Sequence, residues 1–161
     1  MQSALFSDAR GCVYTYGMKT HYKFALVALP LAIITFILSR VIWPDPSGMV
    51  GPDATLLPHF IFLSALESLA FGVGVAFALF GYPRLRASMP DSWLSSAAFI
   101  AIVWALVSWW PHDNMHRVNG MSNFAGLLRI EYIFHFTLII AGCIVAMYFW
   151  KQLTRSSAGA A

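Results

Sequence analysis

The stretch FALVALPLAIITFILSRVIW, residues 24–43, decides the fold, because a helix needs about 20 mostly apolar residues to cross the hydrocarbon core of a bilayer. Three further stretches of this kind follow at residues 58–81, 93–110 and 127–150. Backbone groups inside a bilayer must be satisfied within the segment, so apolar stretches of this length are helical. The sequence therefore predicts an all-α integral membrane protein with a four-helix transmembrane bundle.

The residues that flank these spans are typical of membrane helix ends. Trp43 and Pro44 follow the first span, and Pro58 stands at the start of the second, where proline is tolerated. Gly81 closes the second span, and Pro111 follows the third. Aromatic residues near these ends lie where an interfacial belt is expected.

The composition supports a membrane protein and gives no support to nucleic-acid binding. Apolar residues make up 59% of the chain and charged residues 11%, whereas a soluble domain has about 45–50% and about 25%. The ten Lys and Arg residues are scattered rather than clustered. The predicted partners are the lipid bilayer and, in one interpretation, other membrane subunits.

The distribution of Lys and Arg predicts the orientation by the positive-inside rule. Seven basic residues fall on one side of the spans: Arg10, Lys19, Lys23, Arg84, Arg86, Lys151 and Arg155. Three fall on the other side: Arg40, Arg117 and Arg129. We therefore expect an inner-membrane protein with residues 1–22 and 152–161 in the cytoplasm, the bundle across residues 23–151, and extracytoplasmic loops at 44–57 and 111–126.

Three ionisable residues lie well inside the predicted spans, where such residues indicate a functional site by default. Glu67 and His135 both lie about 12 Å below the outer end of their spans, at a helix rise of 1.5 Å per residue. A carboxylate buried at that depth is costly without a partner. We therefore predict that Glu67 and His135 form a buried polar pair. Glu131 lies one turn above His135 on the same helix face.

Histidines and carboxylates gather at this outer end and predict a metal site. His112 and His116 have the i,i+4 spacing of ligands on one helix face, as do Glu131 and His135. Imidazole and carboxylate groups bind Zn, Fe, Mn or Cu. His59 and Asp113 are the predicted second-shell or substitute ligands. Haem b fits less well, because its two axial histidines would have to face each other at one level.

The reaction stays open, since no motif identifies one. The chain has no GxSxG, no GxxxxGK[ST] and no HExxH sequence. The leading interpretation is a small membrane protein whose histidine–carboxylate site binds a metal ion or handles protons, with a lipid-soluble or redox partner. One alternative is a non-catalytic accessory subunit of a larger membrane complex. Another is a small channel or carrier.

Overall fold

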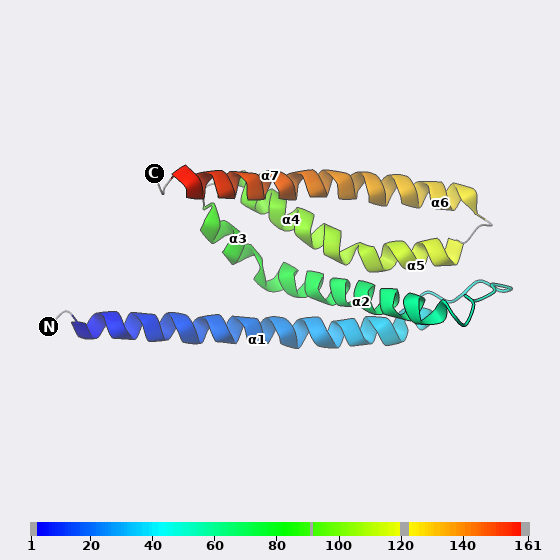
Figure 1. Ribbon diagram of the computed structural model, residues 1–161, viewed down its shortest axis with the longest axis horizontal. Coiled ribbons are helices and arrows are strands. Elements are labelled where there is room, and N and C mark those ends of the chain that lie inside the picture. The colour runs from blue at the N-terminus through cyan, green and yellow to red at the C-terminus, as the bar shows by residue number, and fades with distance from the viewer. Residues whose placement is uncertain (1–2, 91, 120–122, 159–161) are drawn as a thin grey trace.

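The computed structural model describes residues 3–90, 92–119 and 123–158, and it is 85% helix with no strand in those residues. The elements are α1 (Ser3–Ile42), α2 (Leu57–Phe80), α3 (Tyr82–Ser88), α4 (Trp93–Val107), α5 (Trp109–Asn119), α6 (Phe124–Ile130), a π-helical turn (Glu131–His135) and α7 (Phe136–Ala158). Figure 1 shows these helices running nearly side by side. The all-helical class predicted from the sequence is confirmed.

Four helical stretches in the described residues are long and apolar enough to cross a membrane. They are Thr20–Ile42, Leu57–Phe80, Trp93–Asn119 and Phe124–Arg155, with mean hydropathy from 1.6 to 2.3. Many of their large apolar side chains are exposed, including Val41 at 74% and Trp150 at 70%. Such a surface is unfavourable in water and suits contact with lipid.

The third span is longer than predicted. We expected it to end at residue 110 and to be followed by a loop over residues 111–126, but helix α5 continues to Asn119 and α6 begins at Phe124. Pro111 lies in the first turn of α5, where its missing N–H costs no hydrogen bond. The His112 N–H donates to the Ser108 carbonyl at 3.0 Å, so the chain bends at Ser108 without leaving the helix.

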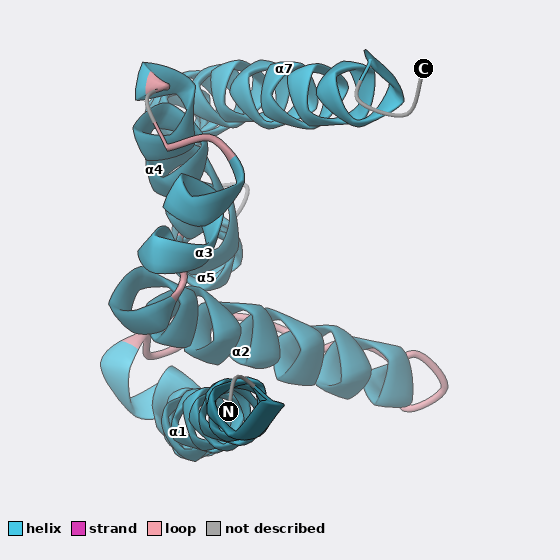
Figure 2. Ribbon diagram, turned by 90° about the vertical axis from the view of Figure 1, so that its left-hand side faces the viewer, coloured by secondary structure: helices cyan, strands magenta, loops and turns pink. Residues whose placement is uncertain are grey.

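The helices pack on one another in chain order. Helix α1 packs on α2, α2 packs on α4 and α5, and α4 packs on α7. In Figure 1, α1 and α7 therefore lie at the two ends of a row, with α2, α4 and α5 between them. The end-on view in Figure 2 shows the same order, with α3 also between the outer helices.

Glycines on α2 allow its neighbours to approach closely. A Cβ atom at Gly72 would lie 2.3 Å from the Ala28 carbonyl oxygen of α1. A Cβ atom at Gly74 would lie 2.7 Å from Val107 Cγ2 and 2.8 Å from Leu106 Cβ of α4. Membrane helices gain van der Waals contact through such small residues, because lipid is as apolar as their side chains.

A small core joins α3, α4 and α7 at the end of the row away from the histidines. Met89, Leu94, Ala98 and Tyr148 are buried together there. The Tyr148 hydroxyl donates to the Leu85 carbonyl at 3.2 Å. Helix α7 is thus fixed against the turn that joins α3 to α4.

Candidate functional site

Two i,i+4 pairs meet where α5 faces the π-helical turn. His116 Nε2 lies 3.0 Å from His112 Nε2 and 3.3 Å from Glu131 Oε1. The second Glu131 oxygen, Oε2, pairs with His135 Nδ1. The ring of His112 also lies edge-on to that of His135, with centroids 5.0 Å apart. The structure therefore brings all four predicted ligands, His112, His116, Glu131 and His135, into one cluster, which we call the histidine cluster.

The π-helical turn presents the second pair of this cluster. Glu131 and His135 are the first and last residues of the turn. A π turn inserts extra backbone into an α-helix, changes the direction of its side chains, and occurs frequently at functional sites. Within this turn the carboxylate of Glu131 and the imidazole of His135 contact each other at i,i+4 spacing.

Aromatic packing holds this turn against the third span. Phe134 is buried within the turn, and its ring stacks on Trp104 with a centroid distance of 5.9 Å and an angle of 8°. It also lies 5.1 Å from the His112 ring. Below it, Trp104 Nε1 donates to Thr137 Oγ1 at 2.9 Å. Each of these contacts crosses from the third span to the fourth, so the two halves of the cluster are held by packing.

The histidine cluster is open on one side. Its side chains range in exposure from 29% for His116 to 45% for Glu131 and 50% for His135. The exposure of Glu131 and His135 therefore leaves room for a small molecule or an ion to reach the cluster.

Glu67 and His135 each have a different partner from the one predicted. Glu67 is only 4% exposed, and its carboxyl lies close to that of Asp113 on α5. No hydrogen bond, ion pair or ring contact joins Glu67 to His135 within the described ranges 3–90, 92–119 and 123–158. The difference arises because α5 packs on α2 and places Asp113 beside Glu67, while His135 pairs with Glu131 one turn earlier on its own helix. His59 is exposed and likewise makes no such contact with the cluster in the described part of the chain.

Glu67 and Asp113 bring two carboxyl groups together where α2 packs on α5. Asp113 directly follows His112 in α5, so the pair lies beside the histidine cluster along that helix. The chain therefore places two further carboxyl groups next to the cluster.

As they stand, the side chains do not form a finished metal site. Among the described residues, no three His, Cys, Asp or Glu side chains are already arranged to hold an ion. The cluster instead makes contacts and hydrogen bonds among its own members. Binding an ion would therefore require small rotations of these side chains.

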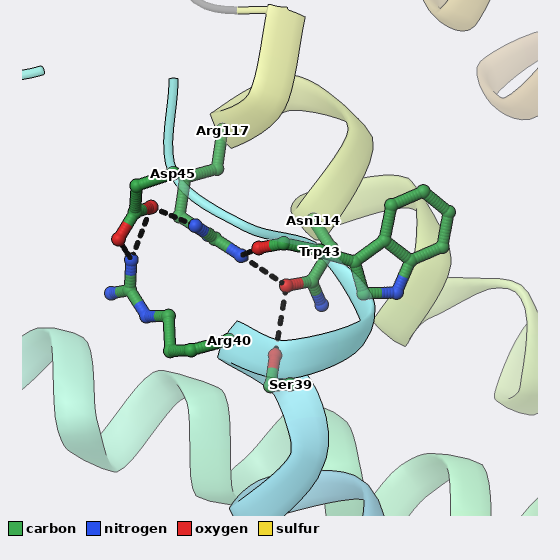
Figure 3. Close-up of polar contacts among 6 residues, drawn as sticks. All are labelled: Ser39, Arg40, Trp43, Asp45, Asn114 and Arg117. Atoms are coloured by element: carbon green, nitrogen blue, oxygen red, sulfur yellow. Dashed lines mark hydrogen bonds and ion pairs between the residues drawn. The ribbon is translucent and has the colours of Figure 1, made fainter. Parts of the chain in front are cut away.

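An arginine holds α5 in place beside the first span, as Figure 3 shows. Arg117 follows His116 and is only 14% exposed. Its guanidinium donates to the Trp43 carbonyl at 2.6 Å and pairs with the Asp45 carboxylate. Asp45 also pairs with Arg40 at 2.5 Å. This set of contacts, the Arg117 clasp, fixes the start of the 44–57 loop against α5.

Asn114 extends the clasp toward α1. It is 4% exposed, and its Oδ1 accepts hydrogen bonds from Ser39 Oγ at 2.8 Å and from Arg117 at 3.0 Å. Its Nδ2 donates to the Trp110 carbonyl at 2.8 Å. This network was not predicted from the sequence. The available signal was the opposite charge of Asp45 and Arg117 in two segments predicted on the same side of the membrane.

Replacing Asp45 with alanine should destabilise the protein by about 1 kcal/mol, since two arginines lose a carboxylate that is itself partly exposed. Thermal unfolding in detergent, followed by circular dichroism, measures the change. Asp53→Ala is the matched control in the same loop. The Asp53 carboxylate accepts hydrogen bonds from the N–H and the hydroxyl of Thr55, which lower the pKa of that carboxyl, and it forms no ion pair with an arginine of the described residues. Equal melting temperatures for the two variants would show that the clasp does not hold α5.

Comparison with protein-family models, with curated proteins and with solved structures finds no match to this chain.

Proposed function

We propose that the histidine cluster binds one divalent transition-metal ion, with His112 Nε2, His116 Nε2 and the Glu131 carboxylate as ligands and His135 completing the set. Ligands at about 2.0–2.1 Å from a tetrahedral ion lie about 3.3–3.4 Å from one another. The separations of 3.0 Å between the two ring nitrogens and 3.3 Å from His116 Nε2 to Glu131 Oε1 are close to that value. This spacing is the observation that carries the proposal.

The hydrogen-bonding capacity of these atoms also favours a cation. A neutral imidazole nitrogen carries either one hydrogen or one lone pair. His116 Nε2 faces two groups at once: His112 Nε2, which donates or accepts according to its tautomer, and the Glu131 oxygen, which accepts. One hydrogen can point along only one of these directions, whereas a metal ion between the three atoms would accept a lone pair from each.

The donor set suits Zn²⁺, Fe²⁺, Mn²⁺ or Cu²⁺. Imidazole nitrogens with one carboxylate are common ligands for these ions, and soft thiolate ligands are absent from the cluster. Haem b fits less well. The His112 ring lies 4.5 Å from the His116 ring and 5.0 Å from the His135 ring, centroid to centroid. These distances leave no space for a porphyrin between two axial histidines.

The position of the cluster supports a role at the extracytoplasmic side, with both termini cytoplasmic. This orientation is supported by the excess of Lys and Arg at the ends of the spans that lie away from the cluster. An ion at an open site near the membrane surface is accessible to a lipid-soluble or redox partner. The role of an accessory subunit in a larger complex remains compatible with such an ion.

Proton transfer through the same residues is the second candidate. The contacts run without a gap from His112 through His116 and Glu131 to His135. Histidine–carboxylate chains of this kind relay protons in membrane proteins. The candidate is favoured by the absence of a ready-made ion site among the described residues.

Titration with metal separates the two candidates. We expect the purified protein, stripped with a chelator, to take up about one equivalent of Zn²⁺ or Fe²⁺ with nitrogen-rich coordination in X-ray absorption. The ion should be released on acidification, because protons compete for the ligand nitrogens. The variant His21→Ala/His59→Ala, which lacks two histidines outside the cluster, should bind equally well. Binding below one tenth of an equivalent for all four ions would reject the metal and leave proton transfer.

A further inference from the structure

The side of α7 that faces away from α4 differs from an ordinary lipid-facing surface. Helix α7 packs mainly on α4 and lies at one end of the row, so the described helices leave its opposite side uncovered (Figures 1 and 2). Residues three or four apart share one side of a helix. Along α7 and the π turn before it, such spacings connect a series of exposed or partly exposed residues, which we call the α7 face: Glu131, His135, Ile139, Gly142, Ala146 and Trp150.

Two ionisable side chains of the α7 face lie at a depth where acyl chains cannot satisfy them. Glu131 and His135 are seven and eleven residues beyond Phe124, the start of the fourth span. At 1.5 Å per residue they lie about 10 and 16 Å below the outer end of that span. Their side chains are 45% and 50% exposed. Ionisable residues at such a depth almost always face protein or a water-filled space. The open side of the histidine cluster therefore requires a cover other than lipid.

The α7 face also allows close approach of another helix. A Cβ atom at Gly142 would meet nothing within 4 Å, whereas at Gly72 and Gly74 it would collide with α1 and α4. Those two glycines each contact a neighbouring helix of the chain, and Gly142 does not. Ala146 follows Gly142 by one turn and is exposed. Small residues at this spacing let two membrane helices pack closely.

Helix α1, at the other end of the row, provides a comparison. Its span is as little buried within the chain as the fourth span, at 11% for each. Between Lys23 and Arg40, however, α1 has no ionisable residue and no glycine. Its free side is therefore suited to lipid. Exposure alone does not distinguish the two outer helices, but the ionisable pair and the open glycine do.

We propose that the α7 face binds the α7 face of a second copy of this chain. The interface of a two-fold dimer brings the same patch of both copies together, so the patch must be complementary to itself. The α7 face meets this condition, because a carboxylate that accepts hydrogen bonds and an imidazole that can donate one lie a turn apart on it. Two copies with the same orientation in the membrane have equal residues at equal depth. Contact at Gly142 would therefore bring the Glu131–His135 pairs of both copies to one level, with each other rather than acyl chains as neighbours.

This dimer goes beyond the proposed ion site and does not depend on it. His112, His116 and Glu131 come from one chain, so a single copy offers these ligands. The contact between two α7 faces in turn needs no ion. The second copy adds polar groups at the open side of the cluster, so each copy forms part of the surroundings of the other's site.

Association is tested with Gly142→Leu and the control Ala25→Leu, which adds a leucine to α1. Both positions are exposed in a single chain, so neither leucine should disturb its fold. Energy transfer between differently labelled full-length chains in liposomes, after treatment with a chelator, measures the dissociation constant. We expect the wild type and Ala25→Leu to dimerise equally. Gly142→Leu should dimerise about tenfold or more weakly, because a leucine overpacks a close helix contact.

Cysteine crosslinking locates the contact. Cys143 is exposed and follows Gly142 directly, so in a Cys12→Ser background a short thiol crosslinker should join two chains through it. With Cys143→Ser and Ile33→Cys, the thiol moves to the free side of α1 and should not crosslink. A monomeric wild type, equal dissociation constants for Gly142→Leu and Ala25→Leu, or crosslinking at position 33 in place of 143 would each overturn the proposal. Metal uptake by Gly142→Leu should equal that of the wild type, so failure of the dimer and failure of the ion site are told apart.

Discussion

Substitution of His116 by alanine should lower the affinity of the protein for a divalent transition-metal ion roughly 100-fold or more. Loss of a residue that merely supports a ligand typically costs about 10–100-fold, and His116 is proposed as a direct ligand. Its Nε2 contacts both His112 and Glu131, so its removal takes away the central atom of the set. Competition with a chromogenic chelator measures the affinity in detergent.

The matched control is His59→Ala. His59 belongs to the same end of α2 as Glu67 but is exposed and makes no contact with the cluster among the described residues. Its loss should leave the affinity unchanged. The conservative variant His116→Asp should restore part of the affinity, because a carboxylate is also a ligand for these ions. Unchanged affinity for His116→Ala, or an equal loss for His59→Ala, would remove the cluster as the binding site.

Leucine in place of Gly72 should separate α1 from α2 and destabilise the protein by about 2–3 kcal/mol or more, because overpacking a close contact forces the backbone to move. Even a single Cβ atom there would lie 2.3 Å from the Ala28 carbonyl oxygen, and that oxygen is backbone and cannot rotate away. Since α1 packs mainly on α2, the clasp contacts near its end, such as that of Ser39 with Asn114, would be left to hold it in the row. Thermal unfolding in detergent and disulfide crosslinking between α1 and α2 measure the effect.

Gly142→Leu is the control for Gly72→Leu. Gly142 also lies inside an apolar helix, but a Cβ atom there would meet nothing within 4 Å. The added side chain would point to lipid, so its expected effect on stability is small. A melting temperature for Gly72→Leu as high as that of Gly142→Leu would show that the α1–α2 approach is looser than described.

The apolar spans could be predicted from the sequence because the bilayer imposes a minimum length on any helix that crosses it. The end of the third span could not be predicted from the sequence, since Pro111 is equally compatible with a loop and with the first turn of a helix. The sequence from His112 to Asn119 is polar, which is typical of a loop, but in the structure it is helical and packs on α2 and α6.

The candidate site could be predicted in part. The i,i+4 spacings indicated which residues share a face, and those faces meet in the structure. The partner of Glu67 could not be found by depth alone, because depth places a residue along the membrane normal but does not give the direction of its side chain. The rotation of each helix about its axis decides that direction. It places Glu67 beside Asp113, and it places His135 beside Glu131. The π turn likewise left no pattern in the sequence that we could identify.

The division of the histidine cluster between the third and fourth spans has a consequence for biosynthesis. A chain emerging from the ribosome presents its N-terminal segments first, so His112 and His116 are made before Glu131 and His135. Until the last span has entered the bilayer, the first pair has no carboxylate to face. The Arg117 clasp, by contrast, uses only residues up to 117 and can hold α5 ready at an earlier stage. Insertion of the fourth span is then the step that completes the cluster, and a chain cut short before Phe124 would be membrane-embedded yet incapable of assembling it.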